Sequence, residues 1–162
     1  MTRDASLLLG HLRPNEIAAC AALVADEPNF ARYRIDAALL ARSLELAVTR
    51  GDEVLTLQRA ARIVGVAWLV PAGAFARSPY LRLIALHAEL QGRGAGGRLL
   101  AAVEAAARPH GDDLFLLVSA SNAGARRFYA RHGYEAIGTL HGYVVPDVDE
   151  VLMRKRLRET PT

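Results

Sequence analysis

The residues best suited to chemistry in this sequence form a glycine-rich hexapeptide, Gln91-Gly92-Arg93-Gly94-Ala95-Gly96, which Gly97 follows. A glycine loop that opens a helix leaves several backbone N–H groups without partners, at the positive end of the helix dipole. Such amides bind phosphate oxygens, and glycine lets a phosphate approach the backbone because it has no side chain. The hexapeptide therefore predicts a site for a phosphate-rich ligand.

The residues on either side of the hexapeptide predict a strand before it and a helix after it. Residues 81–86 are an almost continuous apolar run, which is typical of a strand buried on both faces of a sheet. After the hexapeptide, apolar residues recur at helical spacing until Pro109 and Gly111 end the pattern. The local order is strand, glycine loop, helix.

Two other phosphate-binding motifs can be compared with this stretch. Gly92, Gly94 and Gly97 satisfy the dinucleotide-binding pattern G-x-G-x-x-G, but that motif needs an acidic residue at the end of the next strand, where Ser119 and Ala120 stand. A Walker-type loop needs Lys-Ser/Thr after its last glycine, and Arg98 stands there instead. The context excludes both.

A second block with chemical potential follows the helix. Residues 114–118 form another apolar strand, and a strand-helix-strand unit of this length predicts a right-handed parallel crossover. Ser121 or Asn122 then caps a helix that ends at Gly133 and carries Phe128 and Tyr129. In sequence, the Asn122 amide and the Tyr129 phenol therefore follow soon after the second strand.

Together the two blocks resemble the GCN5-related N-acetyltransferases, the GNAT superfamily. Its central motif, Arg/Gln-x-x-Gly-x-Gly/Ala, matches Gln91 to Gly96, and its second pattern matches Asn122, Phe128-Tyr129 and Gly133-Tyr134. The resemblance covers nearly the whole chain. It implies one α/β (layered α+β) domain, residues 1–162, with a mixed central sheet of six or seven strands and about four flanking helices.

The resemblance also implies a reaction, in which an amine attacks the thioester of acetyl-coenzyme A directly, without a metal. In that family the loop amides hold the pyrophosphate, the strand amides hold the pantetheine and the thioester carbonyl, and the asparagine faces the cofactor arm. The cofactor-binding residues expected here are Ile84, Ala85, Leu86, Gln91, Gly92, Arg93, Gly94, Ala95, Gly96, Gly97 and Asn122. The acceptor is a primary amine on a small molecule, a peptide or a protein.

Proton transfer needs an acid and a base, and the sequence offers candidates for both. Tyr129 follows Phe128 directly and lies seven residues after Asn122, as the catalytic tyrosine does in the family, so it is expected to protonate the leaving thiolate. Glu89 is the first candidate for the base. His87 and His141 are alternatives, each of which is also explained by a plain surface role.

The end of the chain, with Tyr143 and the run DEVLMRKRL, is similar to the ribosomal-protein N-terminal-alanine acetyltransferases. Those enzymes place a glutamate on the strand before the asparagine motif, where this chain has Leu117. An apolar residue there argues against the same acceptor. Two other classes stay open, a degenerate GNAT module that only binds acyl-coenzyme A and a small nucleotide-binding or nucleic-acid-associated protein.

Composition narrows the remaining choices. The 162 residues are 52% hydrophobic, no stretch predicts a signal peptide or membrane span, and Cys20 is the single cysteine, in an apolar setting. The net charge of +3 suits an anionic cofactor, and the arginines are too scattered for a nucleic-acid site. We expect a cytoplasmic protein, monomeric or homodimeric, without nucleic-acid or membrane partners.

The remaining elements follow from periodicity and turn residues. A strand is expected over residues 6–12, helices over 14–27 and 36–49, and a hairpin over 54–58 and 63–70 that Pro71 ends before a loop. Residues 137–143 and 151–157 are expected to form a closing antiparallel pair.

Overall fold

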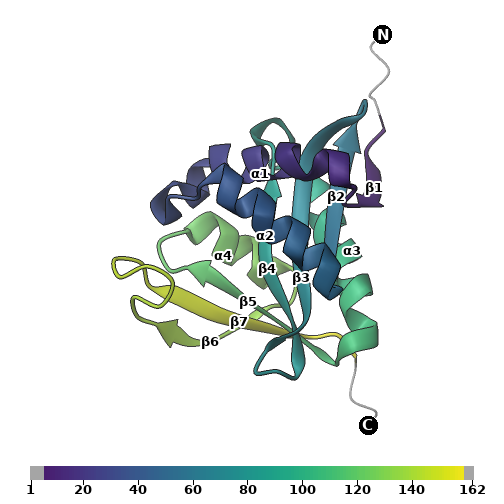
Figure 1. The fold of residues 1–162 in the computed structure, drawn as a ribbon. Helices are drawn as coiled ribbons and strands as arrows, with labels where there is room; N and C mark the ends of the chain where they lie inside the picture. Colours follow the sequence, from purple (N-terminus) through teal and green to yellow (C-terminus); the bar gives the residue numbers. More distant parts are fainter. Residues whose placement is uncertain (1–5, 159–162) are drawn as a thin grey trace. The chain divides into compact units, whose positions relative to one another are not determined.

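The computed structural model describes residues 6–158 and contains a seven-stranded mixed sheet with the strand order β1-β2-β3-β4-β5-β7-β6 (Figure 1). The strands are β1 Leu8–His11, β2 Glu53–Arg59, β3 Arg62–Ala74, β4 Ser78–Leu86, β5 Asp113–Ser119, β6 Glu135–Leu140 and β7 Glu150–Arg156. The α-helices are α1 Ile17–Asp26, α2 Ala37–Arg50, α3 Ala95–Ala107 and α4 Ala123–Arg131. The predicted α/β fold with six or seven strands is confirmed.

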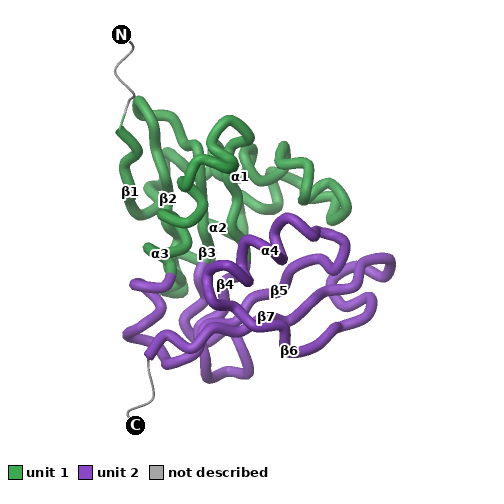
Figure 2. Tube along the Cα trace, turned by 180° about the vertical axis from the view of Figure 1, so that it is seen from behind, with its two compact units in different colours: residues 1–68, 83–103 green, residues 69–82, 104–162 purple. Residues whose placement is uncertain are grey.

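Two compact units make up the chain, one of residues 1–68 and 83–103 and the other of residues 69–82 and 104–162 (Figure 2). We call them unit 1 and unit 2. The long strands β3 and β4 and the helix α3 each contribute residues to both units.

Unit 1 contains the N-terminal strands and the helices α1 and α2, which pack against each other. Asp36 caps α2 by accepting a hydrogen bond from Leu39 N at 3.0 Å, and Gly51 ends the helix with a φ of +88°. Cys20 is fully buried in α1, and burial raises the pKa of its thiol to about 12. The thiol is a neutral core group, as its apolar sequence setting predicts.

Two tight turns shape the hairpins on either side of β3. Ala60 and Ala61 both have positive φ between β2 and β3, which confirms the predicted hairpin. Phe75 and Ala76 also have positive φ, in the turn between β3 and β4, where Arg77 N donates to Ala74 O at 3.1 Å. The expectation that Pro71 ends the strand is wrong, because the fixed φ of proline suits extended backbone and β3 continues to Ala74.

The sheet of unit 2 has one filled face and one half-open face. Leu114, Leu116 and Val118 of β5 are buried, as are their β7 partners Val151 and Met153. The alternate residues of these strands are mostly half-buried. Strand β4 follows the same rule, with Leu81 buried and Arg82 exposed, so the expectation that it is buried on both faces is wrong. The face of β4 that carries Arg82 is therefore not part of the hydrophobic core.

A buried ion pair connects α3 to the final hairpin within unit 2. Lys155 Nζ donates to both carboxylate oxygens of Glu104 at 2.8 Å, and the Tyr134 hydroxyl donates to Glu104 Oε1 at 3.1 Å. Only 8% of Glu104 is exposed, so its charge depends on these donors.

Replacing Glu104 with alanine should lower the free energy of unfolding by about 3 kcal/mol, because it leaves the Lys155 ammonium without its partner. Asp112→Ala is the control, since Asp112 and Arg158 form an ion pair of two exposed side chains at 3.3 Å. It should change stability by less than about 0.5 kcal/mol. Urea unfolding of both variants is the measurement, and equal effects would contradict the assignment.

Candidate functional site

The predicted phosphate loop is an exposed turn that leads directly into α3. Gly92 and Gly94 have φ values of +71° and +80°, the left-handed region that favours glycine. The helix begins at Ala95, and Arg98 N donates to Gly94 O at 3.1 Å as its first internal bond. The amides of Ala95, Gly96 and Gly97 precede that bond, so helix geometry leaves them for an anion.

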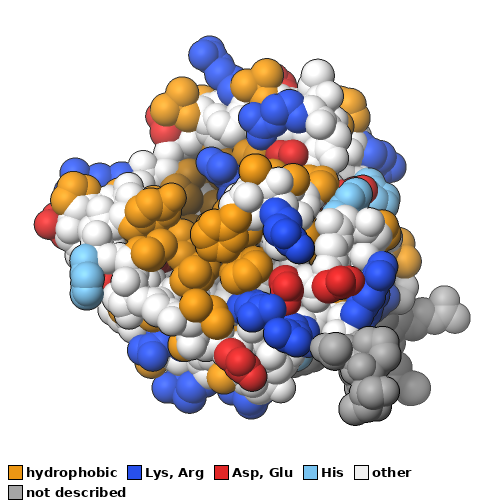
Figure 3. Space-filling model, turned by 90° about the horizontal axis from the view of Figure 1, so that it is seen from below, with side chains coloured by type: hydrophobic (Ala, Val, Ile, Leu, Met, Phe, Trp, Pro, Cys, Tyr) orange, Lys and Arg blue, Asp and Glu red, His pale blue; other side chains and the backbone are white. Residues whose placement is uncertain are grey.

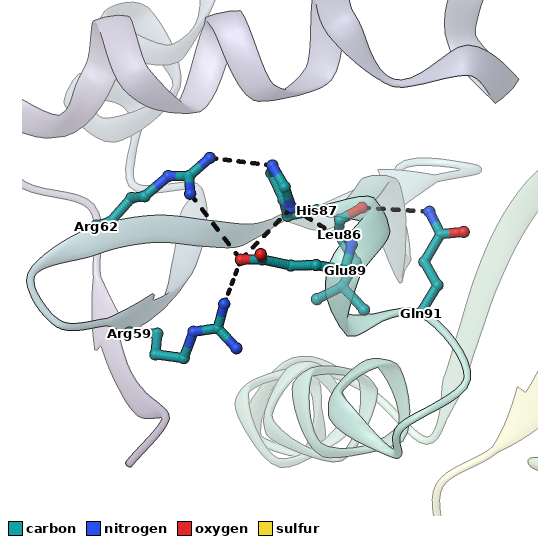
Figure 4. Close-up of polar contacts among 6 residues, drawn as sticks. All are labelled: Arg59, Arg62, Leu86, His87, Glu89 and Gln91. Carbon is teal, nitrogen blue, oxygen red and sulfur yellow. Dashed lines mark hydrogen bonds and ion pairs between the residues drawn. The ribbon is translucent and has the colours of Figure 1, made fainter. Parts of the chain in front are cut away.

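Gln91 anchors the start of this loop through its side chain. Its Nε2 donates to Leu86 O at 3.3 Å, which fixes the loop to the end of β4 (Figure 4), and to Glu27 Oε1 at 3.4 Å. Glu27 is buried after α1 and also accepts two bonds from Asn29, at 3.0 Å each. The loop is thus held by its own first residue, while Gly92 and Gly94 are exposed and Gly96 and Gly97 are half-buried.

Glu89, the candidate base, lies in a cluster of charged side chains (Figure 4). Its carboxylate forms a close ion pair with Arg59 and a longer one, at 4.0 Å, with Arg62. His87 Nδ1 is 3.6 Å from the same carboxylate, and His87 Nε2 is 3.0 Å from Arg62 Nη2. These contacts join the turn after β4 to the two residues that flank the β2–β3 turn, Arg59 at the end of β2 and Arg62 at the start of β3. A catalytic role for Glu89 or His87 stays a prediction.

The strand amides expected to bind the pantetheine belong to Ile84, Ala85 and Leu86. The parallel pairing of β4 with β5 consists of Tyr80 with Phe115 and Leu81 with Leu116. Residues 84–86 lie beyond these rungs, at the carboxyl end of β4. Ligands bind at the carboxyl ends of parallel strands in open α/β sheets.

In unit 2, Asn122 and Tyr129 lie on the helix that follows β5. Asn122 Oδ1 accepts a hydrogen bond from Ala125 N at 3.1 Å, which confirms its predicted cap. Tyr129 is buried, with edge contacts to the rings of Phe128 at 5.3 Å and Tyr134 at 5.5 Å. Burial, and then the nearby Tyr80, raise the pKa of Tyr129 well above its usual range. The phenol stays protonated at neutral pH, as a proton donor must.

His141, the other histidine named as a base, lies on the connection between β6 and β7. Its side chain is exposed, and its Nδ1 is 2.9 Å from Asp149 Oδ2. The bond lowers the pKa of Asp149 and gives His141 a partner at the surface. Its catalytic role is still a prediction.

One buried carboxylate in unit 2 was missed at the level of sequence. Glu150, the first residue of β7, is 2% exposed and lies opposite Ser119 of β5. Its only sequence signal is a carboxylate at the start of an alternating strand.

Exposed apolar residues of the same unit are Phe75, Ile137, Tyr143 and Val144. Figure 3 shows hydrophobic side chains gathered on the surface seen from below, with arginine and lysine side chains beside them.

No group of three or more histidine, cysteine, aspartate or glutamate residues in residues 6–158 is arranged to hold a metal ion. No helix among those residues has the length and hydrophobicity needed to cross a membrane.

Comparison with known proteins places the chain in a family. A family model described as the acetyltransferase (GNAT) domain matches residues 20–156. The fold resembles a ribosomal-protein-alanine N-acetyltransferase from Brucella melitensis, with 25% identity, a TM-score of 0.77 and coverage of 92% of this chain and 99% of that one. No curated protein matches the sequence.

Two further solved structures share the fold. The ribosomal-protein-S18-alanine N-acetyltransferase from Escherichia coli is 17% identical, with a TM-score of 0.78 and coverage of 96% of this chain and 97% of that one. An aminoglycoside 6′-N-acetyltransferase complexed with coenzyme A is 14% identical, with a TM-score of 0.79 and coverage of 96% and 99%.

The chain belongs to the GNAT family of acetyltransferases. This confirms the resemblance read from the two motifs, the predicted enzyme class and acetyl-coenzyme A as the donor.

Replacing Gly94 with valine should weaken acetyl-coenzyme A binding at least tenfold, or about 1.4 kcal/mol, because a side chain there stands between phosphate and backbone. Gly51→Val is a matched control. The φ values of Gly51 and Gly94 are +88° and +80°, and a Cβ at either meets nothing within 4 Å. Both variants bear the same backbone strain, so calorimetry should find a loss of affinity in Gly94→Val only. Equal affinities in the two folded variants would refute the assignment of the loop.

Proposed function

We propose that this protein transfers the acetyl group of acetyl-coenzyme A to a primary amine on a small molecule, a peptide or a protein. The observation that carries the proposal is the positive-φ glycine loop at the start of α3 in a chain of the GNAT family. Arg93, exposed in this loop, adds positive charge beside the amides expected to hold the pyrophosphate.

The other cofactor contacts are proposed from the same arrangement. The amides of residues 84–86 bind the pantetheine arm and the thioester carbonyl, where backbone donors stabilise the charge that develops on oxygen. Asn122 uses its Oδ1 as a cap, so its amide nitrogen is the part that would face the cofactor arm.

Tyr129 is proposed to protonate the departing thiolate. The support for this role is its position in the motif, seven residues after Asn122. The phenol carries its proton throughout the neutral range, and the burial that raises its pKa makes it a weaker acid. A positioned acid contributes about 10² to 10⁴ in rate, and a thiolate leaving group places the effect near the lower end.

Tyr129→Phe should lower kcat at least tenfold, with little change in acetyl-coenzyme A affinity or melting temperature, because only the hydroxyl is removed. Tyr134→Phe is the control from the same aromatic cluster. It loses the bond to Glu104 and should lower the melting temperature with kcat largely kept. A wild-type rate in Tyr129→Phe across about pH 6–9, with chemistry rate-limiting, would make Tyr129 structural.

A catalytically degenerate GNAT module that only binds acyl-coenzyme A is the second candidate. The apolar Leu117 on β5 favours it, because that residue can neither accept a proton nor orient a water molecule. Release of coenzyme A in the presence of an amine panel separates the two functions, since the module would bind the cofactor without turnover.

The same residue predicts that the N-terminal alanine of a ribosomal protein is not the preferred acceptor. Peptides that begin with such an alanine should give a lower kcat/KM than small primary amines in a direct kinetic comparison. A preference for the peptide would contradict the argument from Leu117 and would favour the N-terminal alanine of a ribosomal protein as the acceptor.

A further inference from the structure

Glu27 is a buried carboxylate of unit 1 that is held by neutral donors. It follows α1 directly, and 9% of its surface is exposed. Its Oε2 accepts a hydrogen bond from Asn29 N at 3.0 Å and so caps the short 3₁₀ helix Pro28–Tyr33. Its Oε1 accepts from Asn29 Nδ2 at 3.0 Å and from Gln91 Nε2 at 3.4 Å. One oxygen therefore serves the local turn, and the other reaches a residue 64 positions along the chain.

A second buried carboxylate of the same unit shows what a structural arrangement looks like here. Glu16 is 6% exposed, and it accepts hydrogen bonds from Arg13 N at 2.9 Å and Arg13 Nε at 2.8 Å. It also accepts from Gln58 Nε2 at 2.6 Å. The guanidinium of Arg13 compensates the charge of Glu16 within one turn of chain. Glu27 instead directs its second oxygen to the residue that begins the phosphate loop.

The contacts of Gln91 fix the orientation of its side-chain amide. Its Nε2 lies 3.3 Å from Leu86 O and 3.4 Å from Glu27 Oε1, so each N–H of this nitrogen has one acceptor. A backbone carbonyl and a carboxylate can only accept, so a reversed amide would turn its oxygen against both of them. In Figure 4 the amide nitrogen of Gln91 faces Leu86 O and the amide oxygen points the other way.

The path of the phosphate loop depends on this orientation. Leu90 and Ala95 are packed in one core cluster, so the two ends of the loop are fixed. Between them, a Cβ at Gly92 or Gly94 would meet nothing within 4 Å, so packing does not hold the backbone at either glycine. Arg93 is exposed. Within the loop, the side-chain bonds of Gln91 are therefore what ties the chain to the rest of unit 1.

We infer that Glu27 is a positioning residue for the cofactor site, which acts through Gln91 to hold the phosphate loop in its binding conformation. The inference rests on the proposed function, which assigns this loop to the pyrophosphate of acetyl-coenzyme A. A loop that is held in advance loses less conformational entropy when its ligand binds, so the ligand binds more tightly. The bonds of Glu27 to Asn29 and Gln91 keep its own negative charge buried.

Two methionine variants test this role through the affinity for coenzyme A, measured by calorimetry. Glu27→Met keeps the length of the side chain and removes both acceptors, and Gln91→Met removes the donor from an exposed residue. Each should weaken coenzyme A about fivefold, the size expected when a bond to a charged acceptor is lost. The double variant should bind no more weakly than Gln91→Met, because Glu27 acts only through Gln91.

Glu16→Met is the matched control, since it also removes a buried carboxylate that accepts from a glutamine Nε2 in unit 1. It should lower the melting temperature and keep the wild-type affinity for coenzyme A. Pantetheine provides the matched ligand, because it lacks the pyrophosphate and the nucleotide. Glu27→Met should bind pantetheine as the wild type does, which a general loosening of the site would not allow.

Kinetics separate a positioning role from a catalytic one. In Glu27→Met the KM for acetyl-coenzyme A should rise about fivefold, while kcat at saturating acetyl-coenzyme A should stay within about twofold of the wild type. The reason is that a phosphate loop acts on binding and does not contact the reacting atoms. A tenfold loss of kcat at an unchanged KM would overturn the positioning role.

The remaining outcomes are equally decisive. Wild-type affinity in Gln91→Met overturns the inference even if Glu27→Met fails to fold, because the exposed variant removes the same bond. Losses that add in the double variant, or an equal loss of affinity in Glu16→Met, also overturn it. If the wild type binds coenzyme A and these variants do so equally well, the inference fails and acetyl transfer stands. If the wild type does not bind coenzyme A, the proposed function fails with it.

Discussion

A helix cannot satisfy its first amides from within, and the rest of this structure depends on how α3 meets that constraint. The chain turns through Gly92 and Gly94 at positive φ, and α3 then starts at Ala95, whose amide and the two that follow it have no acceptor within the helix. Gln91 fastens the beginning of the turn to Leu86 O and Glu27. A loop fixed at its first residue and free of side chains at its glycines can hold a phosphate without rearrangement.

The second constraint is the two-residue period of a strand. In β5 and β7 it fills one face with Leu114, Leu116 and Val151 and leaves the other half-open. The second face carries Leu117 and Leu152, which are half-buried, between the rung of Glu150 and the rung of Phe115. The alternation of side chains along β5 and β7 therefore decides which residues join the core.

The parts that the sequence predicted are those set by local chemistry. The glycine loop, the helix after it, the Asn122 cap and the hairpin at Ala60-Ala61 all depend on residues close together in the chain. The parts it could not predict depend on pairing between distant segments. The partner of Glu89 is Arg59, which only the fold brings near, and the burial of Glu150 follows from its register with Ser119. The strand end predicted at Pro71 was wrong because proline ends a strand only where the sheet needs its missing backbone N–H donor.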